Sequence, residues 1–253
     1  MADRPLIARL DDITLAYGER VVLQNMSLDI VEGAITCIVG LSGAGKSTIL
    51  RLLNGLRKAT SGRVIVKGQD LSQLSENELI DLRRSIGFSF QFAALFDSMT
   101  VYENVALPLR ENTTLGEEEI RHRIMDALET VGLTGSETKF PAELSGGMVK
   151  RVGFARAIIT NPDLVLYDEP TTGSDPIITH LLTDTIIRLR SKLGGTAVVV
   201  SHDLQSIFMM ADYVAMLFEG AIIAYGELEK VRSSPNPIVQ QFLQGSEVGP
   251  IPI

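Results

Sequence analysis

The feature that most constrains this chain is a glycine-rich segment at residues 40–48, Gly40-Leu41-Ser42-Gly43-Ala44-Gly45-Lys46-Ser47-Thr48. The apolar run Ile35 to Val39 precedes it and a helical pattern, Ile49 to Leu53, follows it, so it predicts a strand, a glycine loop and a helix. Glycines let consecutive backbone N–H groups face a polyphosphate, and the start of the following helix attracts the same anion. We therefore expect a site for a nucleoside triphosphate; the alternative is a glycine-rich turn that binds nothing.

Two side chains of this segment suit a nucleotide that is bound together with Mg²⁺. Lys46 can reach the β- and γ-phosphates, and the Ser47 hydroxyl can take one position around the metal. The residues expected to contact the nucleotide here are Gly40, Ser42, Gly43, Ala44, Gly45, Lys46, Ser47 and Thr48.

Length and composition restrict the class of protein. With 253 residues the chain exceeds the usual size of a single core, so one α/β domain with an inserted or appended subdomain is expected. Its 45% hydrophobic and 21% charged residues are typical of a globular protein. The net charge of −8 offers no positive field to nucleic acid, and we expect no nucleic-acid partner.

Three observations concern the compartment. Cys37, the single cysteine, lies in a predicted buried strand, which excludes an internal disulfide and suits a reducing compartment. Met1 to Arg4 lack the layout of a signal peptide, and no apolar run approaches the ~20 residues that cross a bilayer. If the protein works at a membrane, we expect another subunit to hold it there.

The chain contains three regions of different pattern. From Leu6 to Ile30, apolar and β-branched residues predict antiparallel strands joined by a turn at 17–20. Residues at about 75–160 are rich in helical spacing, and from Pro162 onward strands alternate with helices, as in a parallel sheet with crossover helices. The expected fold is α/β within one domain (1–253), with a P-loop core, an N-terminal antiparallel β layer and an inserted helical subdomain.

A second group of candidate residues follows the predicted strands. Leu164 to Tyr167 lead into Asp168 and Glu169, which would face the crevice of the glycine loop. Asp168 is placed to orient Mg²⁺ and Glu169 to polarise an attacking water, although acidic turns also end many strands. His202 follows a third strand and could hydrogen-bond the γ-phosphate or the water; the alternative is a structural histidine.

A second glycine-rich helix start lies at Ser145-Gly146-Gly147, ahead of a helix at 149–158. Such a start suits an anion, yet one nucleotide has no need of two cradles in the same chain. The simple resolution is that this cradle closes on the nucleotide of a second copy. The alternative is an ordinary serine-capped helix.

The order of these motifs resembles that of ATP-binding cassette (ABC) ATPases over nearly the whole chain. The matching features are the loop at 40–48, Gln91, Leu144 to Gly147, Asp168-Glu169, Thr172 to Asp175 and His202. The resemblance implies ATP hydrolysis by a head-to-tail homodimer that drives a separate membrane permease. Residues 40–48 resemble the Walker A loop, Asp168 the Walker B aspartate and Glu169 the catalytic base.

The resemblance implies further roles. Tyr17 would stack on adenine, and His202 would be the switch histidine. Gln91 would contact Mg²⁺ and the water while signalling to the membrane partner, and Asp175 would link the two sites of the dimer. The signature residues that would bind ATP across the dimer are Ser145, Gly146 and Gly147.

Two departures from the general ABC pattern indicate one branch of that family. Met148 stands where many transport ATPases have glutamine, and Gly173-Ser174 replace the usual small apolar pair before the aspartate. Both, like residues 91–111 and 235–252, resemble the ATPase of the bacterial Mla phospholipid transporter, in the MCE-associated branch. That branch implies phospholipid cargo, a place on the cytoplasmic face of the inner membrane, an MCE-domain lipid-binding partner and a STAS-domain protein.

Two other function classes remain open. One is a soluble ABC protein of DNA repair or translation, which would typically carry two cassettes and suit a less acidic chain. The other is the ATPase of an importer for amino acids, metals or another small solute, which shares every catalytic residue.

The C-terminal segment at about 235–253 is a candidate interface tail. Ile238, Val239, Phe242 and Leu243 fall on one face of a short predicted helix. That face either packs on the sheet of its own chain or contributes to a subunit interface.

Overall fold

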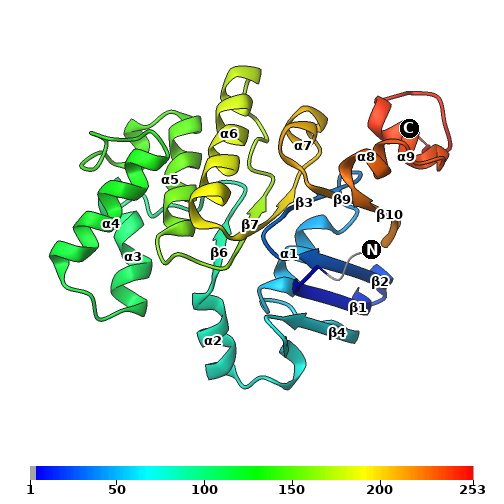
Figure 1. Cartoon of the computed structure of the whole chain (residues 1–253), viewed down its shortest axis with the longest axis horizontal. Helices are drawn as coiled ribbons and strands as arrows, with labels where there is room; N and C mark the ends of the chain where they lie inside the picture. Colours follow the sequence, from blue (N-terminus) through cyan, green and yellow to red (C-terminus); the bar gives the residue numbers. More distant parts are fainter. Residues whose placement is uncertain (1–3, 253) are drawn as a thin grey trace.

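Two β-sheets organise the molecule, a computed structural model that describes residues 4–252 (Figure 1). The first sheet has the strand order β2-β1-β4-β5 and pairs antiparallel throughout. Its strands are β1 (Leu6–Tyr17), β2 (Arg20–Val31), β4 (Ser61–Val66) and β5 (Gln69–Asp70). A tight turn joins β1 to β2, with Gly18 at φ 61° in the left-handed region that glycine adopts at no steric cost. The predicted N-terminal antiparallel layer is confirmed.

The second sheet has six strands in the order β10-β9-β3-β8-β7-β6. They are β3 (Ile35–Val39), β6 (Ile86–Ser89), β7 (Leu164–Asp168), β8 (Thr196–Val200), β9 (Tyr213–Phe218) and β10 (Ala221–Glu227). All neighbours pair in parallel except β10, which runs antiparallel to β9 at the edge. The alternation seen after Pro162 therefore does mark a parallel sheet with crossover helices.

Within residues 4–252 the α-helices are α1 (Lys46–Leu53), α2 (Glu76–Arg84), α3 (Val101–Asn112), α4 (Glu117–Thr130), α5 (Gly146–Ile158), α6 (Pro176–Leu193), α7 (Leu204–Met210), α8 (Leu228–Arg232) and α9 (Pro237–Gln244), and two short 3-10 helices lie at Leu71–Gln73 and Pro141–Glu143.

The second sheet is buried on both faces, which is why its strands are nearly continuous apolar runs. Alternate side chains such as Cys37 and Tyr167 pack with helices α3 to α9, while their neighbours Ile38 and Leu166 pack with α1, α2 and the antiparallel sheet. The fold is thus a three-layer α/β arrangement. Because both faces of the parallel sheet are packed, the sheet is a firm support for the loops at its carboxyl edge.

The range 75–160 contains strand β6 and helices α2 to α5. Helices α3, α4 and α5 gather at one end of the molecule, away from β1, β2 and β4 (Figure 1). Leu79 and Leu82 of α2, however, pack in the core that the antiparallel sheet shares with α1. The inserted helical subdomain at about 75–160 and its limits stay a prediction.

The apolar face of α9 packs largely within its own chain. Val239 is fully buried, and Ile238, Phe242 and Leu243 pack partly buried against the large core. The Gln241 side chain accepts a hydrogen bond from the Ile251 N–H (2.6 Å) and donates one to its carbonyl (3.2 Å), so the segment after α9 folds back onto it. A role of this tail in a subunit interface stays a prediction.

Within residues 4–252, no helix combines the length and the apolar character needed to span a bilayer. The expectation about a signal peptide concerns Met1 to Arg4, and residues 1–3 lie outside the described part of the chain, as does residue 253 of the predicted tail.

Candidate nucleotide-binding site

Four neighbouring strands of the parallel sheet deliver the candidate residues to one edge. The glycine loop follows β3, His202 follows β8, Glu169 follows β7 and Gln91 follows β6. Because parallel strands end at the same edge of a sheet, these four loops converge although they are far apart in sequence.

The glycine loop has a backbone that other residues adopt poorly. Gly40 has φ 147°, and a Cβ there would lie 2.2 Å from the carbonyl oxygen of Leu217. Gly45 precedes α1 at φ 107°, where a Cβ would lie 3.0 Å from Val22 Cγ1. No side chain of the described residues caps α1. The Thr48 N–H donates to the Gly45 carbonyl oxygen at 3.0 Å, so the N–H groups of Lys46 and Ser47 are the ones that the start of α1 offers to an anion.

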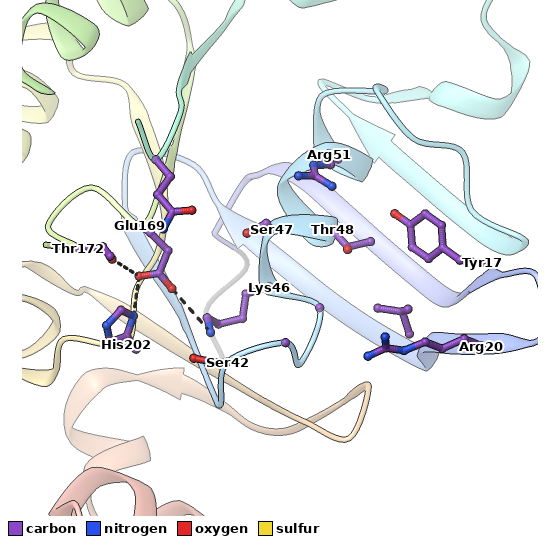
Figure 2. A pocket seen from close by; sticks show the side chains of 14 residues that line it. Tyr17, Arg20, Ser42, Lys46, Ser47, Thr48, Arg51, Glu169, Thr172 and His202 are labelled. Carbon is purple, nitrogen blue, oxygen red and sulfur yellow. Dashed lines mark hydrogen bonds and ion pairs between the residues drawn. The ribbon is translucent and has the colours of Figure 1, made fainter. Parts of the chain in front are cut away.

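An open pocket of about 650 Å³ lies at this edge (Figure 2). Its volume is within the range of small-molecule sites. The predicted site residues that line it are Tyr17, Ser42, Gly43, Gly45, Lys46, Ser47, Thr48, Gln91, Glu169 and His202. The structure therefore brings together residues predicted from five separate segments of the chain.

Glu169 lies at the centre of the polar contacts in this pocket (Figure 2). Its Oε2 accepts hydrogen bonds from Thr172 Oγ1 (2.9 Å) and lies 2.7 Å from His202 Nδ1, while Oε1 lies 3.7 Å from Lys46 Nζ. The backbone of Glu169 has φ 48°, a left-handed conformation that is uncommon for a residue with a side chain. Such strain persists where the surrounding structure imposes it, as at catalytic sites.

Lys46 is buried and holds its ammonium inside the loop. Nζ donates to the carbonyl oxygens of Gly40 (2.9 Å) and Leu41 (3.1 Å). Burial lowers the pKa of Lys46, and the nearby carboxylates of Glu169 and Asp168 oppose that shift. Glu169 meets this partly desolvated cation only at 3.7 Å, and a phosphate in the pocket would add a second anion beside it.

Ser47 and Asp168 form an oxygen pair suited to Mg²⁺. The Ser47 hydroxyl donates to Asp168 Oδ1 at 2.7 Å, and the Gln91 side chain lines the same pocket. Burial raises the pKa of Asp168, and the hydrogen bond from Ser47 opposes this. Hydroxyl, carboxylate and amide oxygens are the hard ligands that Mg²⁺ takes beside phosphate and water, so the residues fit this ion. Their role as metal ligands stays a prediction.

The loop after Gln91 is held by α5. Ala93 and Ala94 have φ 58° and 48°, and Arg156 donates hydrogen bonds to both of their carbonyl oxygens. Gly153 faces Ala93 so closely that a Cβ on it would lie 2.9 Å from the Ala93 Cβ. The position of Gln91 thus depends on a helix more than fifty residues away in sequence.

The signature residues and Asp175 do not line this pocket. Ser145 and Gly146 are exposed at the start of α5, where the Ser145 hydroxyl accepts a long hydrogen bond of 3.4 Å from the Met148 N–H. Asp175 is exposed and caps α6 through Ile177 and Ile178. In one chain these groups lie outside the pocket, and their part in binding the nucleotide stays a prediction.

Three predicted residues act beside the pocket rather than along its wall. Gly40 accepts from Lys46, Asp168 accepts from Ser47, and the Ala44 N–H donates to the Leu41 carbonyl within the loop.

The sequence predicted no role at the site for four lining residues: Arg20, Val22, Arg51 and Thr172. Arg20 and Val22 come directly after the turn at Tyr17, and Arg51 lies three residues after Thr48. An arginine close in sequence to a predicted nucleotide contact was the available signal for Arg20 and Arg51. Tyr17 itself is 39% exposed, and the Arg57 guanidinium lies 4.4 Å from its ring centroid. That contact holds the ring by a cation–π interaction and leaves it at the pocket.

A glycine loop, a buried lysine and a fixed carboxylate around one pocket define a P-loop nucleoside triphosphatase. The chain belongs to the ABC transporter family, whose model, described as "ABC transporter", matches residues 23–172.

Relatives extend the likeness over almost the whole chain. The chain is 40% identical over 245 residues to the "Intermembrane phospholipid transport system ATP-binding protein MlaF" of Haemophilus influenzae, with 97% of this chain and 93% of the relative covered. It is 39% identical over 239 residues to the "Probable ribonucleotide transport ATP-binding protein mkl" of Mycobacterium leprae, with 94% and 69% covered. Among solved structures, a dimeric post-hydrolysis state of the ATP-binding cassette MJ0796, bound to ADP and Pi, has a TM-score of 0.80 at 34% identity, with 87% of this chain and 98% of that chain covered.

Proposed function

We propose that this chain hydrolyses ATP as the nucleotide-binding subunit of an ABC transporter that moves phospholipid. The observation that carries the ATPase is Glu169, which is fixed by His202 and Thr172 and lies 3.7 Å from Lys46. The phospholipid cargo is supported by the 40% identity to the Haemophilus influenzae phospholipid transport protein. The resemblance of Met148 and Gly173-Ser174 to the Mla branch supports the same cargo.

The residues of the pocket divide the work of hydrolysis. Lys46 and the start of α1 bind the phosphates, and Tyr17 stacks on the base. Glu169 accepts a proton from the attacking water. His202 contacts Glu169 and hydrogen-bonds the γ-phosphate. Ser47, Asp168 and Gln91 would hold Mg²⁺, which when bound neutralises charge on the phosphate oxygens.

A second copy completes the site in this proposal. Ser145, Gly146 and Gly147 start α5 on the surface, and Asp175 is exposed at the start of α6. An exposed helix start with free N–H groups suits the γ-phosphate of a nucleotide held by another chain. The dimeric state of the MJ0796 cassette, 34% identical to this chain, supports the pairing of two chains.

The permease would dock beside the Gln91 loop. A groove of about 520 Å³ lies there, lined among others by Phe88, Phe90, Phe96 and Pro108. Phe92 on the same loop is 82% exposed. Exposed aromatic side chains beside a groove are typical of protein interfaces. Binding there would connect the permease to Gln91 and so to the nucleotide.

The proposal places the chain on the cytoplasmic face of the inner membrane. It includes two further partners of the Mla branch, an MCE-domain lipid-binding subunit and a STAS-domain protein. The resemblance of residues 91–111 and 235–252 to that branch supports them.

Ribonucleotide transport is the second candidate cargo, because the Mycobacterium leprae relative that carries this name is 39% identical. Purification of the native complex followed by mass spectrometry of its lipid extract separates the two. Co-purified phospholipid is the expected result. A solute-importer permease with a periplasmic binding protein, recovered without lipid, would contradict the lipid cargo and leave the ATPase in place.

The ATPase itself is tested by Lys46→Ala, which removes the charge that offsets the β- and γ-phosphates. We expect loss of ATP binding or turnover, measured by nucleotide-binding titration and phosphate release. Lys230→Ala, on the exposed surface of α8, is the matched control and should retain both. Turnover near that of the wild type in Lys46→Ala would contradict the proposed site.

A further inference from the structure

Lys150 connects the helix that begins with the signature residues to the loop that follows the catalytic carboxylate. It lies in the second turn of α5, five residues after Ser145. Its Nζ donates one hydrogen bond to the Thr172 carbonyl oxygen and another, at 3.2 Å, to Ser174 Oγ. Both acceptors belong to the segment between Glu169 and Asp175, so one cation holds this segment against α5.

The connection continues directly to Glu169. The hydroxyl of Thr172 donates to Glu169 Oε2 at 2.9 Å, and the Thr172 N–H donates to the Glu169 carbonyl at 3.3 Å. Thr172 also lines the nucleotide pocket. Lys150 is therefore separated from the carboxylate oxygen by a single residue that contacts both.

The surroundings of Lys150 show that this contact is built into the fold. The side chain is partly buried, burial lowers its pKa, and the charge of Glu169 opposes that shift. Its partner Ser174 is one of the residues that depart from the usual ABC pattern, and a small apolar residue there would offer no side-chain oxygen. A partly desolvated ammonium keeps its position only while such acceptors are present.

A packing contact also joins the start of α5 to the helix that follows the segment bound by Lys150. Gly147 approaches Ile178 of α6 so closely that a Cβ on Gly147 would lie 2.8 Å from Ile178 Cγ2. Asp175 caps that helix by accepting from the Ile177 and Ile178 N–H groups. The start of α5 and residues 172–178 are thus in direct contact through one polar and one apolar link, and a shift of α5 would displace both.

We propose that Lys150 is a positioning residue that couples the signature helix to the catalytic carboxylate of the same chain. The inference rests on the proposed function, in which a second copy places its nucleotide against Ser145. Contact at the start of α5 is then transmitted by Lys150 to Thr172, which orients Glu169 for the water in its own pocket. The nucleotide bound by the partner thereby influences hydrolysis in this chain.

The first test compares three substitutions. Lys150→Met keeps the aliphatic stem and removes the ammonium, Lys150→Arg keeps a donor cation, and Ser174→Ala removes one acceptor. We expect Lys150→Met to lower kcat roughly 10- to 100-fold with less than about a threefold change in KM, because misplaced catalytic groups reduce the rate more than binding. Lys150→Arg should restore much of the loss. Ser174→Ala should lower kcat less, and should add little to Lys150→Met.

Lys192→Met is the matched control. Lys192 also joins two helices through its ammonium, since it pairs with Asp126 of α4, but it lies outside the pocket lining. It should leave kcat unchanged. If Lys150→Met fails to fold, judged by thermal unfolding, Ser174→Ala alone decides: an unchanged kcat there overturns the proposal.

The second test asks whether Lys150 acts through Glu169. In a Glu169→Gln background, single-turnover hydrolysis should be no slower after Lys150→Met, because the group that Lys150 orients has already been removed. A further loss equal to that seen with Glu169 present would mean a general structural role and would overturn the proposal. Wild-type protein without ATPase activity would instead refute the proposed function, which distinguishes the two failures.

Discussion

At the scale of single residues, Glu169 shows what a sequence pattern reveals and what it leaves out. An apolar strand that ends in Asp-Glu, downstream of a glycine loop, was enough to predict a carboxylate at the crevice. The left-handed backbone of Glu169, with φ 48°, and its contacts with His202 and Thr172 were not predictable. The contact with His202 depends on how β7 and β8 lie side by side, and that pairing joins segments some thirty residues apart.

Glu169→Gln keeps the shape of the side chain and removes its charge. We expect the variant to bind ATP, to hydrolyse it about 10²- to 10⁴-fold more slowly and to accumulate as a closed dimer, because a general base contributes about that factor. Single-turnover hydrolysis and size-exclusion chromatography with ATP measure both effects. Hydrolysis at the wild-type rate would show that another group is the base.

Gly40→Ala tests the close approach between the glycine loop and β9. The new Cβ would lie 2.2 Å from the Leu217 carbonyl oxygen at φ 147°, so the backbone must move. We expect the free energy of unfolding to fall by about 2 kcal/mol or more, measured by urea denaturation. Gly43→Ala is the matched control, since Gly43 has φ 78° but open space around it, and it should cost about 1 kcal/mol from backbone strain alone. Equal losses in the two variants would refute the steric explanation.

At the scale of elements, α5 is the helix whose importance the sequence conveyed least. Its pattern predicted a glycine-rich start, and Ser145 does precede the helix. Its contacts with the Gln91 loop through Gly153 and Arg156, and with residues 172–174 through Lys150, join segments that no local pattern connects. By contrast, the helical spacing predicted within residues 75–160 does correspond to helices such as α2 and α4, because apolar spacing is a local signal.

The start of α3 offers a test at the same scale, since it follows the Gln91 loop. Thr100 and Glu103 form a capping box there, with the Thr100 hydroxyl accepting from the Glu103 N–H and the Glu103 carboxylate accepting from the Thr100 N–H. The Glu103 carboxylate accepts from the Thr100 N–H and also from the Thr100 hydroxyl (2.9 Å), and these two hydrogen bonds lower the pKa of Glu103 from its ordinary 4.5. The folded state therefore binds fewer protons than the unfolded state between the two pKa values.

The direction of the pH dependence of stability follows from the lowered pKa of Glu103. The stabilisation by Glu103 is complete above pH 4.5 and is lost as the pH falls through the lowered value of the folded state. We expect Glu103→Gln to be less stable than the wild type at neutral pH and equally stable in acid, measured by urea denaturation across pH. A difference that stays constant down to acidic pH would contradict the capping role. Thr100→Ala should cost about 1 kcal/mol at neutral pH.

At the scale of the whole molecule, the strand order turns separate motifs into one site. The parallel alternation and the antiparallel layer were predictable from hydrophobic period and turn residues. The order β10-β9-β3-β8-β7-β6 was not, because strand neighbours are chosen by packing across the chain rather than by local sequence. That order places the ends of β3, β8, β7 and β6 side by side. It also leaves Ser145 and Asp175 outside the pocket, which makes a second chain the decisive question.

A mixture of two defective variants tests whether a second chain completes the nucleotide site. Ser145→Arg places a bulky cation where a partner's γ-phosphate would dock, while Lys46→Ala removes the phosphate contact of the chain's own loop. Each variant alone should fail to pair with ATP: in a dimer of either one, both composite sites lack Lys46 or Ser145. The mixed dimer keeps one intact site, with Lys46 from one chain and Ser145 from the other. We therefore expect ATP-dependent pairing to return only in the mixture, measured by cross-linking of differently labelled chains.

If Ser145→Arg alone still pairs and hydrolyses ATP like the wild type, the signature residues do not act across the dimer, and the pocket of one chain is sufficient.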